Sequence, residues 1–330
     1  MDLQFKFLLL ITILALSEFG VNGDGHGRKL ASHPGLSKDY YKHTCPQAED
    51  VIRKAVFDEY DKDSEPAPGV LRLQFHDCFV EGCDGSVLLD GPGTEKTAKV
   101  NAELDGFDII DIAKAAIEAA CPGIVSCADV LAFAVRDSVV KMGGEYWEVP
   151  GGRKDGRVSI AEHAQAALPE PDYTVPELIA NFAAKGLSAK QMVILSGAHT
   201  VGAGHCDKFV GRLYNYNEKY YTDPTIDPAY AEFLKQKCPE KYNITTQVEN
   251  DAVTPDLFDT GYYQGLGEKK GLFTSDQELV LDKRTAKTVK SLLKKDRFLK
   301  KFGKAMQALA AVEVKLEGEV RKNCRVVNKY

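Results

Sequence analysis

The sequence of 330 residues lacks the features that mark several common classes of protein. It contains no tandem repeat and no low-complexity tract, and its 42 Lys and Arg residues do not outnumber its 48 Asp and Glu residues. These absences argue against a disordered chain, a collagen-like chain and a chain with a general nucleic-acid-binding surface. After residue 23 no uncharged apolar run is long enough to span a bilayer, so we expect no association with a membrane.

Two signatures of chemistry are also missing. The chain has no GxSxG motif, and neither Ser86 nor Ser196 lies in a recognisable oxyanion framework. These absences argue against a secreted hydrolase that uses a serine nucleophile. It has no closely spaced CxxC pair, which argues against a structural zinc site.

The chain begins with a leader-like segment. Residues 1–23 combine Lys6, a short apolar run and small residues before a cleavage point, which is the pattern of a secretory signal peptide. All eight cysteines follow this segment, and an even number of cysteines in a secreted protein is expected to pair. Eight cysteines allow about a hundred connectivities, and counting alone does not choose among them.

The remaining chain is predicted to be mainly α-helical. Apolar residues recur every three or four positions, and few runs alternate as a strand would. Ser188 and Gln191 form a capping box that predicts a helix running toward His199. The other predicted helices span residues 48–60, 107–120, 127–140, 175–184, 230–236, 261–266, 285–293 and 298–311. We therefore expect about ten helices in two lobes, with minimal β structure.

A strongly basic segment lies near the C-terminus. Residues 283–304 carry ten basic residues and a single acid, Asp296, while their apolar residues recur on the opposite face of a helix. The charges form either the solvated face of that helix or a surface that binds an acidic polymer.

Two histidines have chemically unusual neighbours. Arg72 and His76 are four residues apart, so on a helix they share a face, and the cation should keep His76 available as a base. His199 ends a predicted helix among small residues, which would let a flat group such as haem approach and be ligated. Asp276 is a candidate carboxylate partner for the second nitrogen of His199. Structural histidines on a helix face or in the core are the alternatives.

Two turns are rich in oxygen ligands. Asp77, Asp84 and Ser86 lie among turn-permitting glycines, a set that suits Ca²⁺ although the spacing is not that of an EF-hand. The second turn runs from Asp251 to Asp259. A polar surface turn is the alternative interpretation.

Taken together, these residues resemble the plant secretory (class III) haem peroxidases. The resemblance covers nearly the whole chain after the leader and rests on an ordered series of motifs. The series comprises Cys45-Pro46, Arg72, residues 75–78, 125–129, 152–155, 197–200, 254–263, 275–279 and 318–324. It implies a haem-peroxidase fold in one domain over residues 24–330, with haem b between the lobes.

The resemblance implies a role for each residue near the haem. His199 would be the axial ligand, oriented by Asp276, and Phe75 would line the cofactor site. The other face of the haem would hold the catalytic residues Arg72, His76 and Asn101. Of these, His76 would move the peroxide proton, Arg72 would stabilise developing charge and Asn101 would hold His76. Phenolic donors would bind near Pro169.

It also implies two calcium ions and a disulfide pairing. The ligands of the distal ion would be Asp77, Asp84, Ser86 and the carbonyls of Val80 and Gly82, with Glu95 acting through a water. The ligands of the proximal ion would be Thr200, Asp251, Thr254, Asp259 and the carbonyl of Leu257. The disulfides would be Cys45–Cys121, Cys78–Cys83, Cys127–Cys324 and Cys206–Cys238, and Asp129 would pair with Arg153. Glu81 and Asn250 depart from the usual family pattern.

The function implied by the resemblance is a secreted, monomeric peroxidase of the cell wall or apoplast. It would reduce hydrogen peroxide and oxidise small phenolic donors, with lignin or suberin precursors among the compatible substrates. The sequon at Asn243 fits this compartment. Association with acidic wall polysaccharide is compatible with the basic segment. The alternative is a calcium-stabilised wall-binding protein without catalysis.

Overall fold

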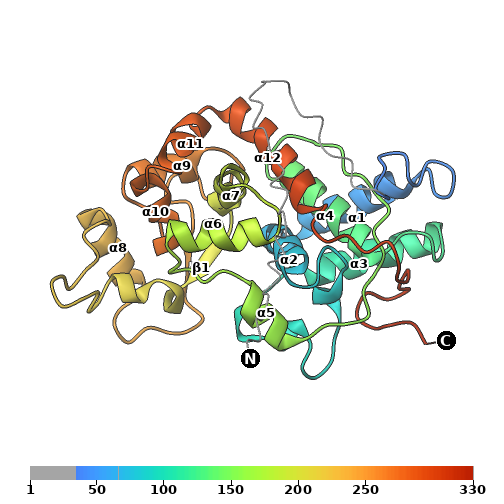
Figure 1. Cartoon of the computed structure of the whole chain (residues 1–330), viewed down its shortest axis with the longest axis horizontal. Coiled ribbons are helices and arrows are strands. Elements are labelled where there is room, and N and C mark those ends of the chain that lie inside the picture. Colours follow the sequence, from blue (N-terminus) through green and yellow to red (C-terminus); the bar gives the residue numbers. More distant parts are fainter. Residues whose placement is uncertain (1–34, 66, 330) are drawn as a thin grey trace, which may run out of the picture. The chain divides into compact units, whose positions relative to one another are not determined.

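The computed structural model describes residues 35–65 and 67–329, so the predicted signal peptide at residues 1–23 lies outside the described residues. The described chain is mainly helical, as expected, with one two-stranded sheet (Figure 1). Its α-helices are α1 (Ala48–Lys62), α2 (Ala67–Val80), α3 (Phe107–Ala120), α4 (Cys127–Lys141), α5 (Ala161–Ala167), α6 (Val175–Ala184), α7 (Ala189–Ser196), α8 (Pro228–Lys237), α9 (Gly261–Gly267), α10 (Thr274–Leu281), α11 (Ala286–Leu292) and α12 (Lys295–Leu309). The strands β1 (Ala203–His205) and β2 (Gln247–Glu249) pair antiparallel, with Gly204 opposite Val248.

Local sequence explains where several helices begin. The Ser126 side chain caps α4 by accepting the N–H of Asp129, and Ser188 caps α7 by accepting the N–H of Gln191. The helix predicted to run toward His199 is α7, but it ends at Ser196. His199 instead lies on the 3₁₀ helix η4 (Gly197–Thr200) that follows.

Three helices of the described chain, α2, α5 and α10, are not among those predicted from apolar spacing. The helix α2 is buried on almost every side, so no single apolar stripe stands out along it. The helix α5 has only seven residues, too few for a periodic pattern to stand out. The helix α10 buries Asp276 and Gln277 together with Leu279, so its buried face does not read as an apolar stripe. All three contain or adjoin predicted site residues, since Arg72 and His76 are in α2, Pro169 follows α5 and Asp276 is in α10.

The helices pack around one main cluster of buried apolar side chains, and a smaller cluster lies between residues 206 and 273. Helices α1, α3 and α4 contact one another, as do α9, α10 and α11, and Figure 1 shows these two groups on opposite sides of α2 and α7. None of the described helices is long and apolar enough to cross a membrane.

Covalent and ionic contacts tie the helices together. The four disulfides are the expected pairs, namely Cys45–Cys121, Cys78–Cys83, Cys127–Cys324 and Cys206–Cys238. The expected buried ion pair is also present, with Arg153 Nη1 2.7 Å from Asp129 Oδ1. Asp129 Oδ2 in addition accepts the hydroxyl of Tyr41 at 2.6 Å and the N–H of Gly152 at 2.6 Å. Both oxygens of this buried carboxylate thus have donors, which is the condition for tolerating a charge there.

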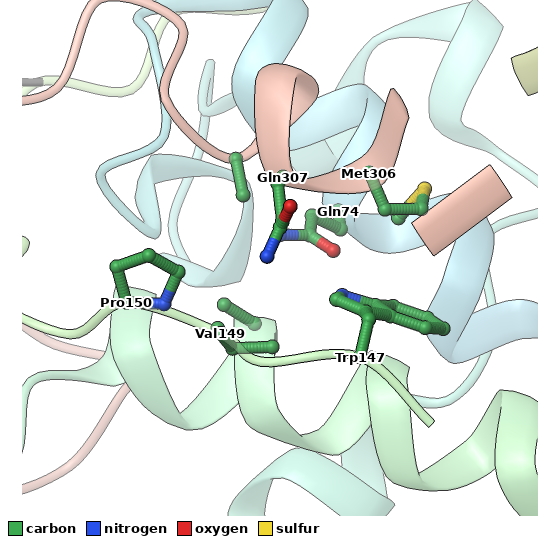
Figure 2. A pocket seen from close by; sticks show the side chains of 8 residues that line it. Gln74, Trp147, Val149, Pro150, Met306 and Gln307 are labelled. Carbon is green, nitrogen blue, oxygen red and sulfur yellow. The ribbon is translucent and has the colours of Figure 1, made fainter. Parts of the chain in front are cut away.

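A small cavity lies on the far side of α2 from His76. Its volume is about 10 Å³, and Figure 2 shows Gln74, Trp147 and Met306 around it. A space of this size holds at most a single water molecule, so it is a packing gap and not a binding site.

Candidate active site

Helix α2 places Arg72 one turn before His76. Arg72 Nε donates to His76 Nε2 over 3.1 Å. The other guanidinium nitrogens donate to backbone carbonyls, from Nη1 to Glu103 at 3.2 Å and from Nη2 to Val100 at 3.4 Å. The planar guanidinium is therefore held by three contacts in fixed directions.

The proton of His76 is assigned to one nitrogen by its partners. Asn101 Nδ2 donates to the Glu95 carbonyl at 2.8 Å, which leaves Asn101 Oδ1 as the acceptor facing His76 Nδ1 at 2.6 Å. Nδ1 therefore carries the proton, and Nε2, which accepts from Arg72, keeps its lone pair. Burial and the Arg72 charge hold the pKa of His76 well below 6.5, against a smaller raising effect of Asn101. His76 is a neutral, oriented base.

His199 has the complementary arrangement. Its Nδ1 lies 2.8 Å from Asp276 Oδ1 and must donate, because a carboxylate only accepts. Asp276 also accepts the hydroxyl of Tyr262 at 2.7 Å and the N–H of Phe273 at 3.1 Å. Burial raises the pKa of Asp276, but these contacts outweigh it and lower the pKa below 3.8. Asp276 is therefore a carboxylate that accepts the Nδ1 proton of His199, so Nε2 is the ring nitrogen that remains for a ligand.

The turn that carries His199 is closely packed against neighbouring aromatic side chains. A Cβ atom at Gly197 would lie 2.4 Å from the Tyr263 hydroxyl and 2.5 Å from the Phe298 ring, so only glycine lets the η4 turn approach these side chains. The ring of Phe273 lies 5.5 Å from the His199 ring, edge-on. The His199 side chain is 39% exposed, so its free nitrogen is accessible.

These features fit a haem. Each histidine has its Nδ1 held by a side-chain oxygen, Asn101 for His76 and Asp276 for His199. The Nε2 atom of His76 accepts from Arg72, and the Nε2 atom of His199 is the ring nitrogen turned away from Asp276. Such a pair could supply an axial ligand and a distal base. Phe75, the predicted cofactor contact, lies 5.7 Å from the His76 ring and stacks on Phe182 at 5.9 Å. Pro169 is half-buried after α5, and the Pro171 carbonyl accepts the N–H of Ser275, next to Asp276.

The predicted distal calcium side chains lie directly after His76, with Asp77 in the last turn of α2 and Asp84 and Ser86 in the segment that follows it. Asp77 accepts the N–H of Gly85 and Asp84 accepts that of Ser86, each at 3.0 Å. Ser86 Oγ and both carboxylate oxygens of Glu95 are buried without any hydrogen-bond partner. Burial and the neighbouring Asp77 charge raise the pKa of Glu95 to about 9. Orphaned buried oxygens beside two other acids are what a bound Ca²⁺ would satisfy.

The two carbonyls predicted for this ion border the loop. The Val80 carbonyl accepts Lys185 Nζ at 3.3 Å. Gly82 has a φ of +90°, and a Cβ there would meet the Glu313 carbonyl at 2.4 Å, so the turn requires glycine. The departure at Glu81 has a local partner, because its carboxylate hydrogen-bonds to His163 Nδ1.

The predicted proximal ligands also converge. Thr200 Oγ1 lies 2.9 Å from Asp251 Oδ2 and 3.4 Å from the Leu257 carbonyl, and Thr254 Oγ1 lies 2.8 Å from Asp259 Oδ1. Within the described ranges, no group of three or more His, Cys, Asp or Glu side chains is arranged to hold a metal. A cation in either loop would therefore depend on hydroxyl and carbonyl oxygens as well, which are ordinary Ca²⁺ ligands.

Three contacts of the site are not predicted by the sequence. The Val100 and Glu103 carbonyls that hold Arg72 cannot be predicted, because every residue type carries a backbone carbonyl. The Tyr262 hydroxyl that contacts Asp276 comes from the Tyr262-Tyr263 pair, which belongs to the motif series but has no assigned role there. Asn250, which also departs from the family pattern, contacts the turn that follows His199 and donates its backbone N–H to the Gly202 carbonyl at 3.0 Å.

Comparison with known proteins agrees with this geometry. The family named Peroxidase matches residues 52–295. Peroxidase 5 of Vitis vinifera is 44% identical over 301 residues, covering 89% of this chain and 92% of the relative. Peroxidase 71 of Arabidopsis thaliana is 41% identical over 331 residues, covering 99% of this chain and 100% of the relative. The chain belongs to the plant class III peroxidase family and is a peroxidase, an oxidoreductase that acts on hydrogen peroxide.

Proposed function

We propose that the chain is a secreted peroxidase that binds haem b and two Ca²⁺ ions and oxidises small phenolic donors. Each turnover would reduce one H₂O₂ to two waters and oxidise two phenols to phenoxyl radicals by one-electron steps. The observation that carries this proposal is the neutral, oriented His76 beside the fixed guanidinium of Arg72. When bound, haem supplies the iron centre that accepts and returns the electrons.

The distal residues handle the proton and the charge of the peroxide. His76 Nε2 would take the proton from one peroxide oxygen and deliver it to the other as that oxygen leaves. Arg72 would stabilise the negative charge that develops as the O–O bond breaks. Asn101 is a positioning residue, since it reaches the chemistry only through His76 Nδ1.

The proximal residues hold and tune the cofactor. His199 Nε2 would hold the haem iron, and Phe75 would line the haem. Asp276 would increase the electron donation of His199 by accepting its Nδ1 proton, as carboxylate partners of ligating histidines do. The distal calcium ligands would be Asp77, Val80, Gly82, Asp84 and Ser86. The proximal calcium ligands would be Thr200, Asp251, Thr254, Leu257 and Asp259.

The donor side of the proposal is supported by fewer contacts. A phenol would bind at the exposed edge of the haem near Pro169. This residue is half-buried after α5, so part of its side chain is accessible. We infer one peroxidase domain over residues 24–330, released to the cell wall or apoplast after removal of residues 1–23. The paired cysteines Cys127–Cys324 and the other three disulfides fit an oxidising compartment.

The test is an absorption spectrum of the purified, haem-supplemented chain, followed by an assay of peroxide-dependent oxidation of guaiacol. A Soret band with guaiacol oxidation supports the proposal. A protein that binds Ca²⁺ but shows neither the band nor the oxidation would instead be the non-catalytic wall-binding protein.

A further inference from the structure

Exposed tyrosines are concentrated in one short loop of the protein. Five tyrosines of the described ranges are exposed, and three of them, Tyr216, Tyr220 and Tyr221, lie within six residues of one another. We call residues 216–221 the tyrosine loop. It precedes α8, inside the segment that the Cys206–Cys238 disulfide closes. Tyr221 is the most exposed of the five tyrosines, at 55%.

Hydrogen bonds hold the tyrosine loop in a tight turn. The backbone N–H of Tyr216 donates to the Tyr221 carbonyl at 3.2 Å, and that of Asn217 donates to the Tyr220 carbonyl at 3.1 Å. The Asn217 side chain in turn accepts the N–H groups of Lys219 and Tyr220, each at 2.9 Å. Asparagine commonly fixes turns in this way. The exposed phenol rings are therefore carried by a well-defined backbone.

The phenol of Tyr221 is well placed to lose an electron and a proton. Because the side chain is exposed, water can accept the hydroxyl proton. Lys235 Nζ lies 5.9 Å from the ring centre, but it is also paired with Glu232 at 2.9 Å, which offsets its charge. The ring of Tyr214 lies edge-on to that of Tyr221 at 6.1 Å, and its hydroxyl donates to the Cys238 carbonyl at 3.1 Å. A carbonyl does not take up this proton, so Tyr221 is the oxidisable member of the pair.

Other exposed tyrosines lie closer to positive charge. The guanidinium of Arg136 is 4.8 Å from the ring centre of Tyr146 and also donates to its hydroxyl at 3.3 Å. Lys219 Nζ lies 4.8 Å from the ring centre of Tyr220. A nearby cation opposes removal of an electron from a ring. Tyr221 is therefore easier to oxidise than either Tyr146 or Tyr220.

From this arrangement we infer that Tyr221 is a site of self-modification, where H₂O₂ joins two copies of the enzyme through a dityrosine bond. Each Tyr221 phenol would lose one electron to the enzyme and one proton to water. The two phenoxyl radicals would then form a carbon–carbon bond ortho to their oxygens, and the two ortho hydrogens would return to those oxygens as protons. In sum, two tyrosines and one H₂O₂ give one dityrosine and two waters. This modification requires the proposed function, because the enzyme must oxidise phenols.

The surroundings of Tyr221 fit a second copy of the same loop. An open hollow of about 380 Å³ is lined by Asn215, Asn217, Glu218, Lys219, Tyr220 and Tyr221. Glu218 and Lys219 are neighbours of opposite charge, so Lys219 of one copy can face Glu218 of the other across a two-fold axis. Such self-complementarity is what contact between identical surfaces requires. The same symmetry would bring the two Tyr221 rings together.

The experiment treats the holoenzyme with H₂O₂ in the absence of an added phenol. It measures dityrosine fluorescence, covalent dimer on denaturing gels after disulfide reduction, and the cross-linked peptide by mass spectrometry. We expect wild type to form a dimer joined at Tyr221, and Tyr221→Phe to lose most of it. The triple variant Tyr216→Phe, Tyr220→Phe and Tyr221→Phe should form none. Tyr146→Phe is the matched control, since Tyr146 is 50% exposed, and it should form as much dimer as wild type.

Guaiacol oxidation by the same samples separates this inference from the proposed function, and circular dichroism confirms that each variant is folded. An enzyme that oxidises guaiacol but forms no dimer would overturn the inference alone, as would equal dimer in wild type and the triple variant. A cross-link that maps to Tyr40 would overturn the assignment to Tyr221. Dityrosine formed without a dimer would overturn the coupling of two copies. A wild-type sample that neither oxidises guaiacol nor forms a dimer would overturn the proposed function as well.

Discussion

Asn101 Oδ1 lies 2.6 Å from His76 Nδ1 and thereby determines which nitrogen of His76 carries the proton. The side-chain amide of Asn101 cannot flip without losing a hydrogen bond, because its Nδ2 donates to the Glu95 carbonyl at 2.8 Å. The backbone carbonyl of Glu95 thus fixes the orientation of His76, the base that we place in the peroxide reaction.

Replacing Asn101 by Val should slow the reaction with peroxide about 10-fold or more, as part of the roughly 10²- to 10⁴-fold that a positioned general base contributes. The reason is that Val cannot accept the Nδ1 proton, so His76 no longer presents Nε2 in one orientation. Stopped-flow mixing with H₂O₂ measures the rate. Asn217→Val, in an exposed turn, is the control and should leave it unchanged. An Asn101→Val protein as fast as wild type would show that the tautomer is held in another way.

The pH dependence of the peroxide reaction follows from the lowered pKa of His76. The base must be neutral, and its pKa lies well below 6.5, so the rate should stay level near neutral pH and fall only far into acid. Arg72→Leu removes one cause of the lowered pKa of His76, so the pH below which the rate falls should be higher. Arg72→Lys keeps the positive charge, so the pH below which the rate falls should stay as low as in wild type. A wild-type rate that already falls at or above pH 6.5 would contradict the account.

Asp129→Asn should lower the free energy of unfolding by about 3–5 kcal/mol, because Arg153 would be left as a buried charge without its carboxylate. Urea denaturation measures the change. Asp58→Asn breaks the exposed pair with Lys54 on α1 and should cost only about 0.5 kcal/mol. Equal changes in the free energy of unfolding in the two variants would mean that the buried Asp129–Arg153 pair stabilises the fold no more than an exposed pair does.

Calcium removal should weaken the haem site through Thr200, which directly follows the proposed ligand His199 and contacts Asp251 at 2.9 Å. Chelation with EGTA should reduce guaiacol oxidation, lower Tm and change the Soret region, and added Ca²⁺ should restore all three. Asp251→Asn should reproduce the spectral change without a chelator. An unaltered spectrum in protein stripped of all calcium would count against the proximal site.

The sequence predicts side-chain motifs well and backbone contacts poorly. Arg72 and His76 could be paired because four residues on a helix always share a face. The fold resemblance supplied partners far apart in the chain, such as His199 with Asp276, that spacing could not. The carbonyls of Val100 and Glu103 escape prediction, because any residue type can offer that oxygen.

The position of the helix before His199 illustrates a second limit. The capping box at Ser188 correctly locates the start of α7, since a cap is a local hydrogen bond. The end at Ser196 depends on tertiary packing, where Gly197 lies against Tyr263 and Phe298 and the chain tightens into η4. Boundaries of this kind are decided by residues that are distant in sequence.

The most direct test of the account is the spectrum and activity of a His199→Ala variant. His205→Ala, in β1 beyond the η4 turn, is the matched control. After haem supplementation, we expect wild type and His205→Ala to show a Soret band and to oxidise guaiacol with H₂O₂. His199→Ala should lose the normal band and nearly all activity, with restoration of the band by added imidazole. A His199→Ala protein with a wild-type band and full activity would contradict the central claim.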